Sequence, residues 1–429
     1  MKVLHIITGL DVGGAEQQLR LMLRRLPAHC EVLTLTNPGQ VADGIEADGT
    51  PVTHLGMTGN RDLTALPRLV RHIRNGGYDV VHTHLYRACV YGRIAARLAG
   101  VRAIVATEHS LGDAVIEGRR LTRSVRSLYR ATERLGSSTV AVSDTVAARL
   151  QRWGVPEPRI HVVPNGIEAH RFAYVPAARA AARARLGLPF DAFVVGGVGR
   201  LVPGKRFDVL VRAVTQIPGV HLLLAGEGPE REALRQTAEQ FGAGNRVHLL
   251  GARGGAVGPA AGTGPGGTPD GSDIPGLLAA MDVFVSPSSE EAFGLAILEA
   301  LAAGLPVLHG CCPAVDELPA DQAPGARRVG PGAHELATAI RDVQRARPGR
   351  LPVPPVVRLY DIGRSAEALM GVYALAVEQA RAPEGRRAAA PAPDAPPPQV
   401  HLPSPPGSDS PSHTPSPSPS PSSHSLSKR

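Results

Sequence analysis

Residues 286–306 read SPSSEEAFGLAILEALAAGLP and indicate the fold more strongly than any other stretch of the chain. The preceding run, residues 281–285, is short, apolar and β-branched, which favours a buried parallel strand over a helix. We expect a helix to begin near Gly294 and to end near Ala303, because Gly304 suits a left-handed cap and a proline follows it. The stretch therefore predicts a strand, a turn and a helix in that order.

One acidic residue interrupts this otherwise apolar helix. Every residue from 295 to 303 is apolar except Glu299, and a helix that is apolar all round is normally buried. A buried carboxylate is costly unless it accepts hydrogen bonds or meets a charge. The two vicinal hydroxyls of a ribose would supply such hydrogen bonds, and a structural arginine is the alternative partner.

The turn before the helix offers a second group of ligand contacts. Free backbone N–H groups at the helix N-terminus, at Phe293, Gly294 and Leu295, can receive phosphate. Glu291 stands at the mouth of the turn and can accept hydrogen bonds from hydroxyls beyond the phosphates, or it is a solvated loop acid.

These residues resemble the signature of the retaining glycosyltransferases of the GT-B type, family 4, also called glycosyl transferases group 1. In that signature two glutamates are separated by seven residues, with Phe-Gly between them, as Glu291 and Glu299 are here. The resemblance implies that Glu291 touches the donor sugar, that the backbone of residues 293–295 holds the diphosphate and that Glu299 binds the ribose. It also implies transfer from a nucleoside-diphosphate sugar to an acceptor hydroxyl, in polysaccharide or glycolipid synthesis.

Composition is compatible with this interpretation. The chain has 429 residues, of which 43% are hydrophobic and only 3% aromatic, so the core must consist of Ala, Val, Leu and Ile, as suits an α/β protein. The four cysteines have no metal-ligand spacing and are too few for a disulfide framework, which indicates a reducing compartment. The apolar N-terminus is too short for a signal peptide and predicts a first strand, so we expect a cytoplasmic protein.

The net charge of +8 leaves nucleic acid, an anionic membrane surface or a phosphorylated substrate as partners. Aromatic residues are too sparse for a stacking platform, so we expect no nucleic acid. One predicted helix carries a basic stripe, of which Arg123 and Arg126 are the acceptor-side candidates, and an apolar stripe that includes Leu128. The full basic stripe is 119, 123, 126, 130 and 134. It is either a solvated face or a surface for anionic lipid, at the inner membrane face, or for the phosphate of a lipid-linked acceptor.

Short apolar runs alternate with helical stretches along the first part of the chain, which predicts a doubly wound parallel sheet. Ligands of such sheets lie beyond the carboxyl ends of the strands, where His84, Glu108 and His109 fall. A single histidine is more often structural, but the resemblance places a catalytic-centre histidine at His109. Glu108 is expected to be a polar neighbour of the acceptor or only a solvated acid.

Two loops add further donor-site candidates. The turn after the first strand contains Gly13 and Gly14, which admit a ligand to the backbone or simply make a tight connection. The resemblance places this loop beside the donor sugar and the acceptor.

Residues 199–206 read GRLVPGKR and nearly match a P-loop, but Arg206 occupies the place of the hydroxyl that would hold Mg²⁺. The resemblance instead makes Arg200 and Lys205 a clamp for the donor diphosphate. Their charge would stabilise the leaving nucleotide without a metal. The chain contains no Asp-x-Asp, so we expect no metal site and no cofactor besides the donor.

The expected architecture is α/β, with two Rossmann-like doubly wound domains that face each other across a cleft. We expect an N-terminal domain at 1–170, a linker at 171–188 and a nucleotide-sugar domain at 189–362 with a flexible Gly-rich insert at 254–271. A closing helix at 363–381 returns to the first domain, and a disordered Pro/Ser-rich tail covers 382–429.

Two other classes of function remain compatible with the sequence. A nucleotide-sugar epimerase of similar shape would need additional acid and base residues and no acceptor. A non-catalytic nucleotide-sugar-binding protein would keep the fold without turnover.

Overall fold

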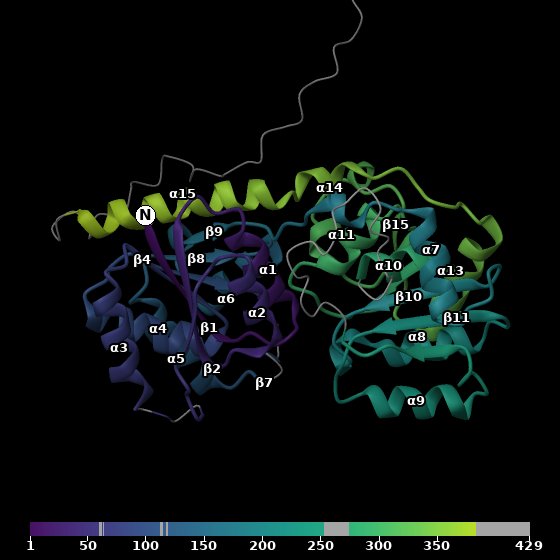
Figure 1. Cartoon of the computed structure of the whole chain (residues 1–429), viewed down its shortest axis with the longest axis horizontal. Helices are drawn as coiled ribbons and strands as arrows, with labels where there is room; N and C mark the ends of the chain where they lie inside the picture. Colours follow the sequence, from purple (N-terminus) through teal and green to yellow (C-terminus); the bar gives the residue numbers. More distant parts are fainter. Residues whose placement is uncertain (60–61, 63, 112–114, 117–118, 253–273, 383–429) are drawn as a thin grey trace, which may run out of the picture.

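The computed structural model describes residues 1–59, 62, 64–111, 115–116, 119–252 and 274–382. Within them the chain forms two α/β domains that lie side by side (Figure 1). The predicted insert at 254–271 lies outside the described residues, as does the predicted tail beyond residue 382.

The first domain contains a parallel sheet in the order β3-β2-β1-β4-β5-β8-β9. Its strands are β1 Lys2–Gly9, β2 His29–Asn37, β3 Val52–His54, β4 Val80–His84, β5 Ile104–Glu108, β8 Ser138–Ala141 and β9 Ile160–Val162. Its helices are α1 Gly14–Leu23, α2 Gly39–Ala47, α3 Ala65–Gly76, α4 Tyr86–Ala99, α5 Arg123–Glu133 and α6 Asp144–Trp153. The predicted doubly wound parallel sheet is confirmed, with β1 at its centre between β2 and β4.

The second domain contains a parallel sheet in the order β12-β11-β10-β13-β14-β15. Its strands are β10 Phe193–Val198, β11 Val220–Ala225, β12 Val247–Leu249, β13 Val283–Ser286, β14 Val307–His309 and β15 Ala326–Arg328. Its helices are α8 Phe207–Thr215, α9 Arg231–Gln240, α10 Ile274–Ala280, α11 Leu295–Ala302, α12 Pro313–Asp316 and α13 Ala333–Ala346. Strand β15 carries two exposed arginines at the sheet edge and no apolar run, which is why its sequence does not predict a strand.

The predicted helix of residues 286–306 is confirmed. Helix α11 begins after Gly294, whose φ of 112° favours glycine, and ends before Gly304, whose φ is 70°. Strand β13 precedes it, so the turn between them carries the two candidate glutamate positions to the carboxyl edge of the second sheet.

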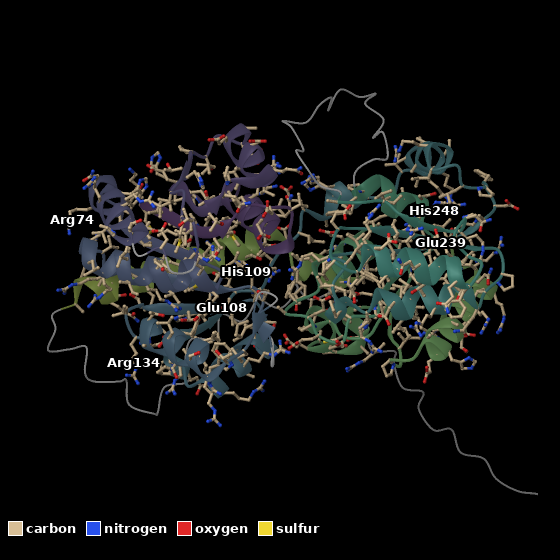
Figure 2. All side chains as sticks on the ribbon, turned by 90° about the horizontal axis from the view of Figure 1, so that it is seen from below. Arg74, Glu108, His109, Arg134, Glu239 and His248 are labelled. Carbon is tan, nitrogen blue, oxygen red and sulfur yellow. The ribbon has the colours of Figure 1, made fainter. Side chains whose placement is uncertain are left out.

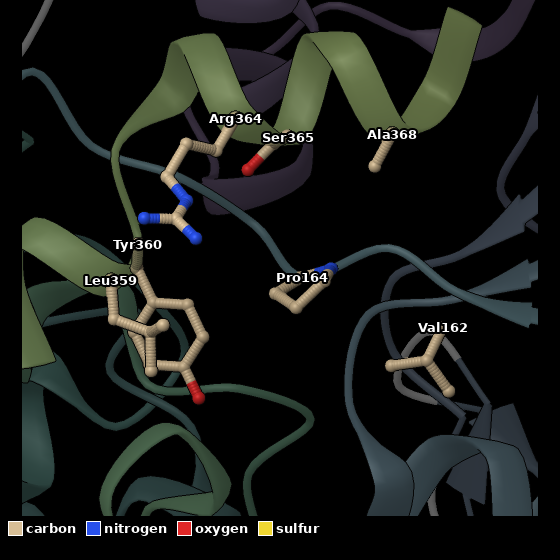
Figure 3. Close-up of a pocket in the computed structure, with 7 residues that line it drawn as sticks. All are labelled: Val162, Pro164, Leu359, Tyr360, Arg364, Ser365 and Ala368. Carbon is tan, nitrogen blue, oxygen red and sulfur yellow. The ribbon is translucent and has the colours of Figure 1, made fainter. Parts of the chain in front are cut away.

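The chain crosses between the domains twice, and the two crossings lie side by side. The N–H of Ile167 donates to the carbonyl of Tyr360 at 2.9 Å, and the N–H of Ile362 donates back to Ile167 at 3.2 Å. A shallow pocket lies at these crossings (Figure 3) and is lined by Val162, Pro164, Leu359, Tyr360, Arg364, Ser365 and Ala368. None of the candidate site residues lines it.

Helices α7 Pro176–Arg185, α14 Pro355–Leu359 and α15 Ile362–Arg381 complete the chain. Helix α7 lies within the predicted linker and is fixed to the second domain by ion pairs from Arg179 and Arg183 to Asp282 at 2.6 and 2.8 Å. Helix α15 runs along the first domain (Figure 1), where its Tyr373 hydroxyl lies 2.6 Å from His82 Nδ1. Among the described residues, no helix combines the length and apolar character needed to cross a bilayer.

The predicted basic helix differs from the observed one in two respects. Helix α5 begins at Arg123, because the Thr122 hydroxyl caps it by accepting a hydrogen bond from the N–H of Val125. Arg119 lies instead in the short strand β7 Arg119–Arg120, which pairs with β6 Val115–Ile116. Leu128, expected on the apolar stripe, is 47% exposed, because the larger Tyr129 takes the buried position.

Candidate active site

The glycine-lysine loop of the second domain meets the signature loop at an ion pair. Lys205 Nζ donates to Glu291 Oε1 at 2.5 Å, and both side chains are largely buried. The N–H of Ser289 donates to the carbonyl of Gly204 at 3.2 Å, which fixes the two backbones against each other. The two residues that the sequence assigns to diphosphate and to sugar therefore occupy one place.

Two glycines of a neighbouring loop position Arg200. The N–H of Leu201 donates to the carbonyl of Glu227 at 2.8 Å. A Cβ on Gly226 would lie 1.8 Å from the carbonyl oxygen of Gly199, and one on Gly228 would lie 2.2 Å from that of Leu201. Only glycine permits this approach, so residues 226–228 hold the backbone that carries the exposed Arg200 side chain.

The N-terminus of α11 is open to a ligand. Gly294 is its N-cap residue, and no side chain among the described residues caps the helix. Phe293 is buried and packs edge to face on Tyr360, with ring centroids 5.0 Å apart. A Cβ on Gly294 would lie 2.5 Å from Cys312 Sγ, so the backbone at this point tolerates no side chain. The free N–H groups and the positive end of the helix dipole suit a phosphate.

Glu299 lies on the next turn of α11 and is half-buried. Burial raises the pKa of its carboxyl to about 7, and the attraction of Arg171 only partly opposes this. The described residues provide it with no hydrogen-bond or ion-pair partner, since Arg171 is engaged with Glu168 at 3.3 Å. The structural-arginine alternative is therefore not supported, and the carboxylate can accept hydrogen bonds from a ligand.

The glycine turn of the first domain reaches the same place. A Cβ on Gly14 would lie 3.9 Å from Leu295 Cδ1, the second residue of the α11 N-terminus. Beside it, the side chain of Glu16 folds over Gly13, where a Cβ would lie 2.3 Å from Oε2. Burial raises the pKa of Glu16, and the nearby guanidinium of Arg200 acts against this rise. Sequence reasoning missed Glu16, although its position three residues after Gly13 is that of a carboxylate that folds back over a helix start.

His84 and His109 lie together at the carboxyl edge of the first sheet. His84 Nδ1 is 3.1 Å from His109 Nε2, and the two rings are stacked. His84 Nε2 is in turn 3.1 Å from His5 Nδ1, a contact that the sequence did not predict. Burial lowers the pKa of His109 to about 4, so this ring is neutral. Figure 2 labels Glu108 and His109 on the part of the first domain nearer to the second.

Glu108 is neither solvated nor free to serve an acceptor. Its side chain is 2% exposed and accepts a hydrogen bond from the Tyr129 hydroxyl at 2.6 Å. Burial raises its pKa, while Tyr129 and the fully buried Arg93 lower it. The expectation of a solvated acid was wrong, because the side chain points into the packing between β5 and α5.

The acceptor-side arginines lie on α5. Arg123 is exposed at its first turn, and Arg126 donates from Nη2 to the carbonyl of Arg152 at the end of α6. Arg134, just past the end of α5, lies at the outer edge of the first domain in Figure 2. The structure therefore does not bring Arg126 to the donor-site residues.

Three side-chain contacts tie α6 of the first domain to the second domain. Ser143 Oγ donates to the carbonyl of Ala292 at 2.7 Å, inside the signature loop. Arg149 pairs with Glu290 at 2.7 Å. Glu317 accepts from the N–H of Thr145 at 2.7 Å and from its hydroxyl at 2.6 Å. The signature loop is thus held from both domains.

One further cluster contains possible metal ligands. Nitrogen atoms of His5, His82 and His84, all buried, lie within 4.8 Å of one another. Both nitrogens of His82 are already engaged, with Tyr373 at 2.6 Å and with Thr107 at 2.7 Å.

Comparison with known proteins identifies relatives for both domains. The model of Glycosyltransferase Family 4 matches residues 12–171, and that of Glycosyl transferases group 1 matches residues 192–345. An Escherichia coli UDP-Gal:alpha-D-GlcNAc-diphosphoundecaprenol alpha-1,3-galactosyltransferase is 30% identical over 278 residues, which are 62% of this chain and 66% of the relative. A D-inositol 3-phosphate glycosyltransferase of Mycolicibacterium smegmatis is 29% identical over 73% of this chain and 71% of the relative. The chain thus spans about two thirds of each relative's length.

Solved structures share the fold. Anabaena Alr3699/HepE in complex with UDP and glucose is similar with a TM-score of 0.74 and 22% identity, over 87% of this chain and 100% of that one. A glycosyltransferase from Rickettsia africae is similar with a TM-score of 0.68 and 16% identity, over 88% and 98%.

Proposed function

The chain belongs to the family 4 glycosyltransferases of the GT-B type, and we propose that it transfers a sugar from a nucleoside-diphosphate sugar to an acceptor hydroxyl with retention of configuration. The observation that carries this proposal is the convergence of three groups at the carboxyl edge of the second sheet. These groups are the Lys205–Glu291 ion pair, the uncapped N-terminus of α11 and the Glu299 carboxylate.

Each group matches one part of a nucleotide sugar. Glu299 accepts hydrogen bonds from the ribose hydroxyls, and the N-terminus of α11 receives the diphosphate. Arg200 and Lys205 neutralise its charge, while Glu291 and His109 contact the sugar. The Anabaena protein of the same fold was solved with UDP and glucose, and the E. coli relative is named for UDP-galactose, which supports a uridine-linked donor as the first to test.

The chemistry follows from where charge develops. The bond between the anomeric carbon and the phosphate oxygen breaks, so that positive charge grows on the sugar ring and negative charge on the leaving diphosphate. Two cationic side chains and a helix N-terminus placed at that diphosphate stabilise the transition state. The acceptor oxygen then bonds to the anomeric carbon from the same face, and its proton passes to the departing phosphate oxygen.

We propose that this reaction needs no divalent metal, because Arg200 and Lys205 supply the positive charge that a metal would bring. Turnover should persist in a chelating agent such as EDTA. Loss of turnover in EDTA, with recovery on addition of Mg²⁺ or Mn²⁺, would contradict this part of the proposal.

We further propose that the acceptor carries phosphate and is met at an anionic membrane surface, as in glycolipid or polysaccharide synthesis. The names of both relatives include a phosphorylated acceptor. Helix α5 supports the idea, since Leu128 is 47% exposed on a helix that carries exposed arginines. Binding to vesicles with anionic lipid at low salt, weakened by Arg123→Glu, is the expected result. Equal binding to neutral vesicles would remove this proposal.

Release of nucleoside diphosphate from a panel of uridine-, guanosine- and adenosine-linked sugars tests the main proposal. We expect release from one donor, accelerated by the correct acceptor. Conversion of one nucleotide sugar into another without release would favour an epimerase. Binding without any turnover, with every acceptor tried, would favour a non-catalytic protein.

A further inference from the structure

Three histidines of the first domain form a continuous chain that ends at the candidate active site. His5 Nδ1 lies 3.1 Å from His84 Nε2, and His84 Nδ1 lies 3.1 Å from His109 Nε2. Both ring pairs are stacked, with interplanar angles of 17° and 28°. Only the two outer nitrogens, His5 Nε2 and His109 Nδ1, lack a partner among the described residues.

The chain is electrically neutral. Burial lowers the pKa of His5 to about 3 and that of His109 to about 4, and it lowers the pKa of His84 well below its usual value. A neutral imidazole has one N–H and one lone pair. Three neutral rings joined by two hydrogen bonds must all donate in the same direction. One end of the chain therefore presents an N–H, and the other presents a lone pair.

The two ends differ in their surroundings. His5 is fully buried, and an orphaned N–H in a protein interior is rarer than an orphaned acceptor. His109 is only partly buried and directly follows β5, at the edge of the sheet where ligands of parallel sheets bind. An oxygen of a bound ligand can accept a hydrogen bond there. The outer N–H therefore belongs at His109 Nδ1, and the outer lone pair belongs at His5 Nε2.

We propose that His5 and His84 are positioning residues that hold His109 as the neutral Nδ1–H tautomer, so that it donates a hydrogen bond to an oxygen of the bound sugar and does not act as a general base. The identity of the ligand as a sugar rests on the proposed function. The tautomer does not, since it follows from the protein alone.

The backbone beside the chain supports a positioning role for His84. Leu85, which follows it directly, has φ of 73°, a conformation that a leucine rarely adopts. Leu85 is the residue before the first turn of α4. The strained turn thus lies where the His84 ring must pass between the rings of His5 and His109.

A divalent metal is the competing occupant of this region. His5, His82 and His84 offer nitrogens within 4.8 Å of one another. Coordination by all three would cost His82 one of its hydrogen bonds, to Tyr373 or to Thr107, and both are short. It would also require lone pairs on His5 Nδ1 and His84 Nε2, which the hydrogen-bonded chain does not allow.

Nitrogen-15 chemical shifts of the imidazole rings in the full-length, histidine-labelled protein test the proposal without any activity assay. The chain has 16 histidines, so His109 is identified by comparison with His109→Gln. We expect a protonated Nδ1 and an unprotonated Nε2 at His109. The reverse pattern would overturn the proposal, and a failure to find any donor substrate would leave this result intact.

Two variants of His84 provide a matched functional test. His84→Asn can place a donor where Nδ1 lies, whereas His84→Asp places only an acceptor there. We expect turnover by the Asn variant to exceed that of the Asp variant by at least about tenfold, with melting temperatures recorded for both. Higher turnover by the Asp variant would mean that His109 works as a base. One equivalent of bound zinc per chain, lost in His84→Asn, would establish the metal site instead.

Discussion

The Lys205 ammonium lies 2.5 Å from the Glu291 carboxylate, so the cation expected at the donor diphosphate is paired with the anion expected at the donor sugar. A diphosphate carries more negative charge than one carboxylate and competes for the same lysine. Donor binding is therefore expected to move Lys205 from Glu291 to the phosphates and to release Glu291 for the sugar hydroxyls.

Replacing the two partners should have different effects. Lys205→Ala should weaken binding of nucleoside diphosphate and lower turnover by about 100-fold or more, because a charge at the leaving group is lost. Glu291→Gln should lower turnover as well, but leave nucleoside diphosphate binding unchanged or tighter, because Lys205 is released. Calorimetry and steady-state kinetics measure these effects. Equal weakening of diphosphate binding in both variants would contradict the exchange.

Glu299 should make donor binding depend on pH. With its pKa near 7, the carboxyl is mostly protonated at pH 6 and mostly ionised at pH 8. Since the ionised form accepts hydrogen bonds from both ribose hydroxyls, affinity should rise by about tenfold between these values. An intact nucleotide sugar is the suitable ligand, because its diphosphate does not titrate in this range. In Glu299→Gln the dependence should disappear; its persistence would assign it to another group.

The same carboxyl should affect stability in the opposite direction. Its pKa in the folded protein is about 7, above the model value of 4.5, so folding favours the protonated form. The stability it contributes is present below pH 4.5 and is lost as the pH rises through 7. Glu299→Gln should therefore gain more stability relative to wild type at pH 8 than at pH 5, as measured by denaturant titration. An equal difference at both values would argue against the raised pKa.

The close approach at Gly226 should make this position intolerant of substitution. Gly226 has φ of 151°, and a Cβ there would lie 1.8 Å from the backbone oxygen of Gly199. Gly226→Ala should cost about 2 kcal/mol or more of unfolding free energy. Gly204→Ala is the matched control, because its Cβ would meet nothing within 4 Å. A Gly226→Ala protein as stable as the control would show that the two loops are not tightly packed.

The contact of Glu317 with α6 should hold the domains together. Its carboxylate accepts from the N–H and hydroxyl of Thr145 and from the N–H of Asp144 at 3.1 Å. Glu317→Ala leaves these donors without a protein partner and should cost about 1–3 kcal/mol. X-ray scattering should show a larger radius of gyration than in wild type. An unchanged radius, together with an unchanged melting temperature, would assign the contact no role in domain closure.

Local sequence rules predicted those elements whose signals are local. Helix α11 could be placed to within a residue or two, because Gly294 and Gly304 adopt left-handed conformations at its ends. The start of α5 was misplaced because Thr122 acts as the cap, and a basic stripe at helical spacing continues through the strand before it. Strand β15 has no apolar signature at all.

Contacts between distant residues were not predictable in the same way. Glu108 could not be assigned to the interior without knowing that Tyr129 packs above it. The bond from Ser143 to Ala292 joins residues 149 positions apart, and no local pattern marks it. The chain of His5, His84 and His109 likewise depends on the neighbouring positions of β1, β4 and β5 in the sheet.

The most direct test of the account is nucleoside diphosphate release by wild type, Glu299→Ala and Lys205→Ala, with Glu378→Ala on the exposed face of α15 as the control. We predict release from one nucleotide sugar by wild type and by the control, and a loss of about 100-fold or more in both site variants. Release at equal rates by all four proteins would show that the site around α11 does not hold the donor and would contradict the account.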